Sequence, residues 1–298
     1  MKLYNFDRFD KFLISEEDAP IDQISKEPCL HGFSTFVIPP SIVPDGKIPV
    51  FDGEKWNIVE NKFWVPSVEE KTFYSGRNYT GIPQLPIPDA FCCISLPSIP
   101  RLLNGALFGS KLSNRIRIIN LHIVNIFKKH ENILNPKTAD HLLHSTYHTD
   151  IELVIYLIKR SIDDIITANY VKLYISDIET SHKIFIESIG DLLSTKKKNG
   201  KDEVKDCIKF NKHEKFLKTI NDLHNSLKHD FFSPETDMRF GLNFPVVISI
   251  KTDHGDLNKI DYHNHSLGQL VLGFSDFLLD NVTLSKRLLD KAHNESVL

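Results

Sequence analysis

The sequence predicts an α+β protein in which a small β-rich N-terminal module, residues 1–100, precedes a mainly α-helical bundle domain, residues 101–298, with a short β-hairpin insertion. Two observations lead to this prediction. Most of the prolines lie before residue 101, where they prevent long helices. From Leu112 onward, apolar residues recur every three to four positions, as on the buried face of a helix.

The N-terminal module is predicted to contain short strands and turns. Its clearest element is a hairpin, with strands at 48–51 and 56–59 on either side of Asp52-Gly53. Because glycine tolerates positive φ, an Asp-Gly pair between two apolar runs is typical of a β-hairpin. The module offers no catalytic constellation, so we expect it to serve recognition or docking.

The second domain is predicted to begin with a helix that runs from about Leu112 and ends before Pro136. The later elements are expected in the following order: a helix from Thr138 or Thr149 through Ile166, a helix at 175–193, a charged loop at 196–201, a helix at 212–228, a hairpin of residues 244–250 and 259–262, a helix capped by Asn264 or Ser266 that reaches Leu278, and a short helix after Thr283.

Composition excludes several classes of protein. A formal net charge of -3 argues against a globally basic nucleic-acid binder, although a local patch remains open. The N-terminus has no apolar signal region, and no apolar run reaches membrane-spanning length, so we expect a cytoplasmic protein without a membrane partner. Its four cysteines, Cys29, Cys92, Cys93 and Cys207, have no metal-type spacing and are expected to be reduced thiols.

The end of the predicted helix at 212–228 carries the strongest candidate site. Asn225 and His229 are four residues apart and share a helix face, with Asp222 one turn earlier and Lys228 beside them. A histidine titrates near neutral pH and a lysine stabilises phosphoryl charge, so this group suits RNA phosphate binding or acid/base chemistry. The alternative is an ordinary helix C-terminus, where Lys and His bond to the last carbonyls.

The run from Asn221 to Asp230 resembles the motif of the HEPN superfamily, which has an arginine, a polar residue and, after a gap of four to six residues, a histidine. Asn225 matches the polar residue and His229 the histidine, whereas His224 stands in the place of the arginine. An imidazole is mostly neutral at pH 7 and cannot make the two parallel phosphate bonds of a guanidinium. The resemblance to the HEPN motif implies that the protein binds or cleaves RNA.

The resemblance to the HEPN superfamily covers residues from about 105 to 295. It implies a homodimeric helical bundle that acts as a metal-independent endoribonuclease of a toxin, abortive-infection or antiviral-defence system, without a cofactor. In that scheme His229 is the acid/base in cleavage through the RNA 2′-hydroxyl, Asn225 orients the phosphate or His229, and His224 is a substitute catalytic residue. Lys228 and Asp222 are the expected substrate-binding residues.

The N-terminal module is similar to the first segment of phage tail-fibre assembly proteins. The similarity lies in Pro49-Val50-Phe51-Asp52-Gly53 followed by Trp56, although Asn61-Lys62-Phe63 replaces the Asp-Arg-Gly found there. It implies a protein partner that contacts residues 1–100, which could be a phage component. Two alternative functions are therefore a non-enzymatic virion accessory protein and a partner-binding module with a degenerate HEPN fold.

Two histidine groups and one basic stretch remain as weaker candidates. His141, His144 and His148 share a predicted helix face, and His263 and His265 alternate on a predicted strand, so each group could hold a transition metal. With fourteen histidines in the chain, such spacings arise by chance, and we expect surface or capping roles. The lysines between 196 and 218 could steer an anionic polymer, but a solvated loop is the simpler expectation.

Overall fold

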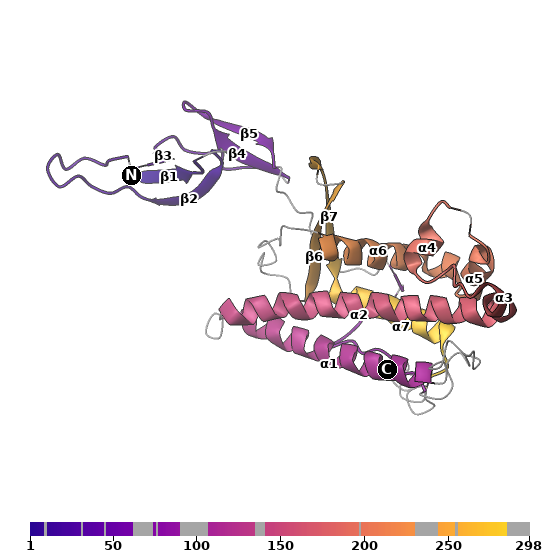
Figure 1. Ribbon diagram of the computed structural model, residues 1–298. Helices are drawn as coiled ribbons and strands as arrows, with labels where there is room; N and C mark the ends of the chain where they lie inside the picture. The colour runs from indigo at the N-terminus through magenta and orange to yellow at the C-terminus, as the bar shows by residue number, and fades with distance from the viewer. Residues whose placement is uncertain are drawn as a thin grey trace. The chain divides into compact units, whose positions relative to one another are not determined.

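The computed structural model confirms the α+β fold class (Figure 1). It describes residues 1–8, 11–30, 32–44, 46–61, 74–75, 77–89, 107–134, 141–196, 198–229, 244–253 and 256–284. The chain divides into two compact units, Met1–Ser67 and Val68–Leu298. This division lies after Ser67, whereas the composition of the sequence predicts a domain boundary near residue 100.

The N-terminal unit contains a three-stranded antiparallel sheet of order β2-β1-β3 and a separate hairpin of β4 and β5. The strands are β1 (Lys2–Phe6), β2 (Leu13–Asp18), β3 (Ser34–Thr35), β4 (Lys47–Phe51) and β5 (Trp56–Glu60). Phe12 forms an isolated bridge to Val50 and so connects the two sheets. Tyr4, Phe51 and Trp56 form a small buried cluster between them.

The predicted N-terminal hairpin is confirmed, and its turn has a clear local cause. The side chain of Asp52 accepts hydrogen bonds from the backbone N–H groups of Glu54 and Lys55, both at 2.9 Å. Gly53 has a φ of 112°, which other residues adopt only with strain. The Asp-Gly pair therefore directs the reversal between β4 and β5.

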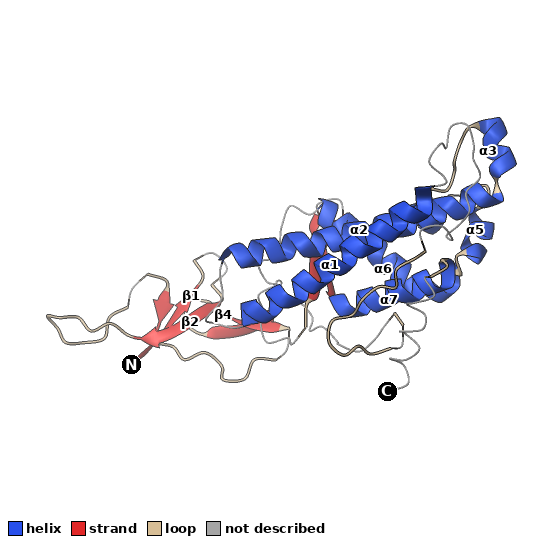
Figure 2. Ribbon diagram, turned by 90° about the horizontal axis from the view of Figure 1, so that it is seen from below, coloured by secondary structure: helices blue, strands red, loops and turns tan. Residues whose placement is uncertain are grey.

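The second unit is built around two long helices, α1 (Phe108–Leu134) and α2 (His141–Leu173), which lie side by side (Figure 2). Ion pairs from Arg115 to Asp164 and from Lys129 to Asp150 show that they run antiparallel. Their facing stripes are almost fully buried: Leu112, Ile116, Ile119, Ile123 and Ile126 on α1, and Ile151, Val154, Ile155, Ile158, Ile162, Ile165 and Ile166 on α2.

The single helix expected at 175–193 is wrong, because the structure has two short helices there, α3 (Ile175–Ser181) and α4 (Ile189–Leu193). His182 adopts the left-handed conformation with a φ of 53° and ends α3. Ser188 then begins α4, where its hydroxyl accepts from the backbone N–H of Asp191 at 3.2 Å. The apolar spacing continues across this break because Ile186 and Ile189 are both buried.

An additional short helix, α5 (Lys201–Cys207), follows the charged loop and is missing from the sequence-based prediction. It starts after Gly200, which has a φ of 79°, and it carries Asp202 and Glu203 in its first turn, where carboxylates complement the helix dipole. The high charge of this segment conceals the helix, since Val204 alone of its residues is buried.

The remaining elements agree closely with expectation. Helix α6 (Phe210–His229) is followed by the antiparallel hairpin of β6 (Val246–Asp253) and β7 (Asp256–Ser266), and Ser266 leads into α7 (Leu267–Asn281). Helix α6 packs against α2, α7 and β6. The helix expected after Thr283 lies outside the described residues.

The segment around residues 74–89 packs onto the helical unit, which explains the early boundary between units. The side-chain amide of Asn120 on α1 bonds to both backbone groups of Leu85, donating to its carbonyl at 2.9 Å and accepting from its N–H at 2.8 Å. Tyr79 lies directly over Gly268 of α7, where an added Cβ would overlap the tyrosine ring. Pro83, Pro86 and Pro88 therefore belong to an extended segment on the surface of the helical bundle, which we call the strap.

We predict that Gly268→Ala destabilises the protein by about 1–3 kcal/mol, because the new methyl group displaces the Tyr79 ring. Urea unfolding followed by circular dichroism measures this change. Gly190→Ala is the matched control, since its nearest neighbour is Ser188 Oγ at 3.5 Å. An ordinary helical glycine-to-alanine change is neutral or stabilising by up to about 1 kcal/mol. Equal effects of the two substitutions would contradict the close packing of Tyr79.

Candidate functional site

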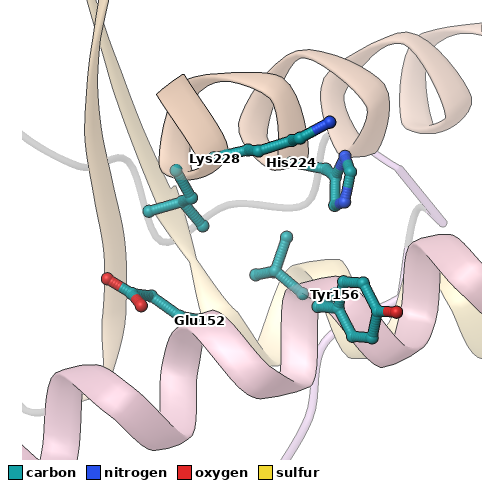
Figure 3. Close-up of a pocket in the computed structure, with 6 residues that line it drawn as sticks. Glu152, Tyr156, His224 and Lys228 are labelled. Carbon is teal, nitrogen blue, oxygen red and sulfur yellow. The ribbon is translucent and has the colours of Figure 1, made fainter. Parts of the chain in front are cut away.

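A pocket of about 350 Å³ lies between α2 and α6 in the helical unit (Figure 3). We call it the α2–α6 pocket and define it by the residues that line it: Glu152, Ile155, Tyr156, His224, Leu227 and Lys228. Four of these side chains are polar or aromatic and therefore able to recognise a ligand, whereas Ile155 and Leu227 provide apolar surface.

Helical spacing brings these side chains together. Glu152 and Tyr156 are one turn apart on α2, and His224 and Lys228 are one turn apart on α6. Next to His224 in the chain, Leu223 is fully buried and anchors this part of α6 in the core. The pocket thus lies at the edge of the packed interface, where the two helix surfaces meet solvent.

His224 has the most distinctive environment in the pocket. Its ring stacks on Tyr156, with centroids 5.9 Å apart and an interplanar angle of 29°. Burial lowers the pKa of His224, the positive charge of Lys159 lowers it further, and Asn225 and Asp163 act in the opposite direction. Its Nδ1 atom is buried and has no hydrogen-bond partner among the described residues. A neutral imidazole can accept a proton or hydrogen bond from a bound molecule.

A buried ion pair underlies this environment. Lys159 is only 7% exposed, and its ammonium lies 2.6 Å from Oδ2 of Asp163. The other carboxylate oxygen of Asp163 accepts from the backbone N–H of Ile189 at 2.9 Å, at the start of α4. One aspartate therefore holds a buried cation near His224 and helps to position α4 on α2.

The structure describes four of the five predicted site side chains. His224 and Lys228 line the pocket. Asn225 is exposed, and its side chain bonds to His224, whereas Asp222 is half-buried and is not part of the pocket lining. His229 is the last residue of α6, and its side chain lies outside the described residues. Three of the described side chains are therefore in or beside the pocket.

The sequence gives no signal that α2 contributes side chains to the pocket. Glu152 and Tyr156 lie about seventy residues before His224 and belong to no motif, so only the packing of two helices brings them near it. Lys159 carries a usable signal, because it directly follows the apolar run Leu157-Ile158 and precedes Asp163 by one helical turn. A lysine in a buried stripe with a carboxylate at that spacing indicates a buried ion pair.

The two histidine groups are only partly covered by the described residues. No group of three or more His, Cys, Asp or Glu residues suited to a metal occurs in the described part of the chain. The side chains of His141 and His144 lie outside it. His263 and His265 are half-buried and stack on each other at 5.8 Å, and Nδ1 of His265 lies 2.8 Å from the Tyr74 hydroxyl. A surface role for His265 is therefore wrong.

Several lysines of the basic stretch form ion pairs within the protein. Lys209 and Lys212 both bind Asp280 of α7, at 2.9 and 2.6 Å, and His213 contacts the same carboxylate at 2.8 Å. These partners hold the pKa of Asp280 well below its usual value despite its burial. Lys209 and Lys212 thus help to dock α6 on α7, and their shared carboxylate balances one of their two charges.

Comparison of the chain with protein-family models, with curated proteins and with solved structures finds no match. Among the described helices, none has the length and apolar character needed to cross a membrane.

We predict that His265 makes the protein sensitive to acid. Burial, together with the charges of His263 and Lys215, lowers its pKa to about 4. In the unfolded chain a histidine binds a proton near pH 6.5, so stability is complete above that pH and falls as pH decreases from 6.5 to 4. The loss amounts to about 3 kcal/mol at most.

Urea unfolding of wild type and His265→Gln between pH 7 and pH 4.5 measures this effect. Glutamine can still bond to Tyr74 but does not titrate, so the variant should lose less stability over this range. Titration of the carboxylates affects both proteins and cancels in the difference. Identical pH dependence would show that His265 titrates normally in the folded protein.

Proposed function

We propose that this chain binds RNA at the α2–α6 pocket and cleaves it there, as a HEPN-like protein of an antiviral-defence, abortive-infection or toxin system. The observation that carries the proposal is the presence of His224 and Lys228 in one pocket, with an aromatic ring beside them. A cation binds phosphate, an aromatic ring stacks on bases, and an imidazole transfers protons.

The proposed reaction is an internal displacement on RNA. His224, uncharged because its pKa is lowered, accepts the proton of a 2′-hydroxyl. The 2′-oxygen forms a bond to the adjacent phosphorus, and the bond from phosphorus to the 5′-oxygen breaks. A proton from His229 goes to the leaving oxygen, which yields a 2′,3′-cyclic phosphate and a 5′-hydroxyl. Lys228 stabilises the charge on the phosphoryl oxygens.

This scheme moves the central role from His229 to His224. The sequence motif favours His229 as the acid/base, whereas the pocket contains His224. Two histidines can divide the work, one removing a proton and the other supplying one. Homodimer formation, which the HEPN resemblance implies, remains part of the proposal and would bring two copies of α6 into one assembly.

A second candidate function is docking of a protein partner by the N-terminal unit, as in a virion accessory protein. One observation favours it: several large apolar side chains of this unit are strongly exposed, with Ile24 at 94%, Ile42 at 80% and Ile38 at 75%. Exposed apolar side chains are typical of interaction surfaces where they form one patch, and the docking candidate requires that these three do so. Under this candidate alone, RNA binding would not depend on the pocket.

We predict that Lys228→Ala weakens binding of single-stranded RNA several-fold and lowers the salt dependence of binding by about one unit, because one phosphate contact is lost. Fluorescence anisotropy of a labelled RNA at several salt concentrations measures both effects. Lys218→Ala is the control, since Lys218 lies on the same helix and pairs with Glu214 away from the pocket. Equal binding by wild type and Lys228→Ala would refute the RNA site and favour the docking function.

We predict that His224→Gln and His229→Ala each reduce RNA cleavage at least about a hundredfold, as loss of an acid/base residue does. Gel analysis of labelled RNA measures the rate and detects the cyclic phosphate. His148→Gln on α2 controls for loss of a histidine outside the pocket. Full cleavage by His224→Gln would exclude its role as base, and full cleavage by both variants would exclude the proposed reaction.

A further inference from the structure

The α2–α6 pocket has two chemically different ends. Figure 3 shows the rings of His224 and Tyr156 at one end and the carboxylate of Glu152 at the other, with Lys228 extending towards His224. The apolar side chains of Ile155 and Leu227 complete the lining. An occupant must therefore combine an apolar or aromatic body with a hydrogen-bond donor that faces Glu152.

The size of the pocket restricts the form of the nucleic acid. A volume of about 350 Å³ is near the lower limit for small-molecule sites and corresponds to a single nucleotide. A base within a duplex is stacked and paired, and it reaches such a pocket only after extrusion at an energetic cost. The pocket therefore suits one unstacked base of a single strand, with Tyr156, half-exposed at 51%, as the stacking platform.

Glu152 is unexpected in a site for a polyanion, because a carboxylate repels phosphate. Its presence is favourable where a base donates hydrogen bonds to it, since an ionised carboxylate is an acceptor only. Guanine presents two adjacent donors, N1–H and the N2 amino group, that match both carboxylate oxygens. Adenine and cytosine present one donor beside an acceptor, and uracil presents N3–H between two carbonyl oxygens, so each of these places an acceptor near the carboxylate.

We infer that the α2–α6 pocket recognises a guanine base of single-stranded RNA, with Glu152 as the specificity-determining residue and Tyr156 as the stacking residue. This inference rests on the proposed RNA-binding function and adds base selection to it. Lys228 holds the phosphate, Tyr156 stacks on the base, and Glu152 accepts hydrogen bonds from the donor edge of that base. The site then selects both for an unpaired strand and for one base.

Binding of uridine decamers that differ at one central base tests this inference. The decamers carry 2′-fluoro groups, which prevent cleavage, and contain guanine, inosine, adenine or only uracil. We expect the full chain to bind the guanine decamer about tenfold more tightly than the uridine decamer, as a two-bond base contact allows. Inosine, which lacks the N2 amino group, should bind with intermediate affinity.

Variants identify the residues responsible. Glu152→Gln replaces one acceptor oxygen by an amide donor with little change of shape, and it should reduce the guanine preference to less than about twofold. Tyr156→Ala should weaken binding of every decamer to a similar degree, whereas Tyr156→Phe should retain binding because the ring is kept. Far-ultraviolet circular dichroism checks that each variant is folded.

The outcomes separate this inference from the proposed function. Equal affinity for all decamers, with binding still reduced by Lys228→Ala, would overturn guanine recognition and leave the RNA site intact. Absence of binding to any decamer would overturn the RNA site itself. Guanosine monophosphate serves as competitor, and guanine recognition within RNA requires that it compete only at concentrations far above that of the decamer. Displacement at equal concentration would overturn the RNA form of the inference in favour of a free nucleotide.

Discussion

The helical unit depends on the burial of α2. Its apolar residues, from Ile151 to Ile166, face α1 on one side and α6 on another, and six of them are completely inaccessible: Val154, Ile155, Ile158, Ile162, Ile165 and Ile166. Each such side chain contributes about 1.5–3 kcal/mol on transfer from water. Because α2 also contacts α3, α4 and α5, the placement of each helix from α3 to α6 depends on this one surface.

The candidate site arises where this burial ends. Glu152 and Tyr156 are exposed residues of α2 at the edge of its contact with α6, where Tyr156 stacks on His224. The buried pair Lys159 and Asp163 lies inside the same interface. A buried ion pair contributes little net stability, but it fixes a charge and a backbone contact in defined positions. The geometry around His224 is therefore a product of core packing.

The two units differ in how fully they bury their apolar residues. The helical unit has a continuous core, and the strap at residues 74–89 covers part of it. In the N-terminal unit the buried cluster consists of Tyr4, Phe51 and Trp56, while Ile38 and Ile42 remain exposed. A small unit with so little core has limited intrinsic stability, and binding to a partner would add to it. The two units thus differ in how much of their stability comes from their own core.

The sequence by itself determines the elements whose signals are local. The isoleucine spacing of α1 and α2, the Asp52-Gly53 turn and the C-terminal hairpin each depend on neighbours within a few residues, and all are predictable. Continuous apolar spacing hides the break between α3 and α4, where the left-handed conformation of His182 ends the first helix. High charge hides α5, which begins after the left-handed Gly200 and buries only Val204.

Only the tertiary structure decides which side chains share a site. His224 and Lys228 are already candidates in the sequence, and helix packing brings them to Glu152 and Tyr156, which belong to no motif. Helix packing also draws residues 77–89 onto the bundle, through contacts such as Asn120 with Leu85. The physical reason is that local propensity depends on near neighbours, whereas the face that a helix presents depends on which partner buries its apolar stripe.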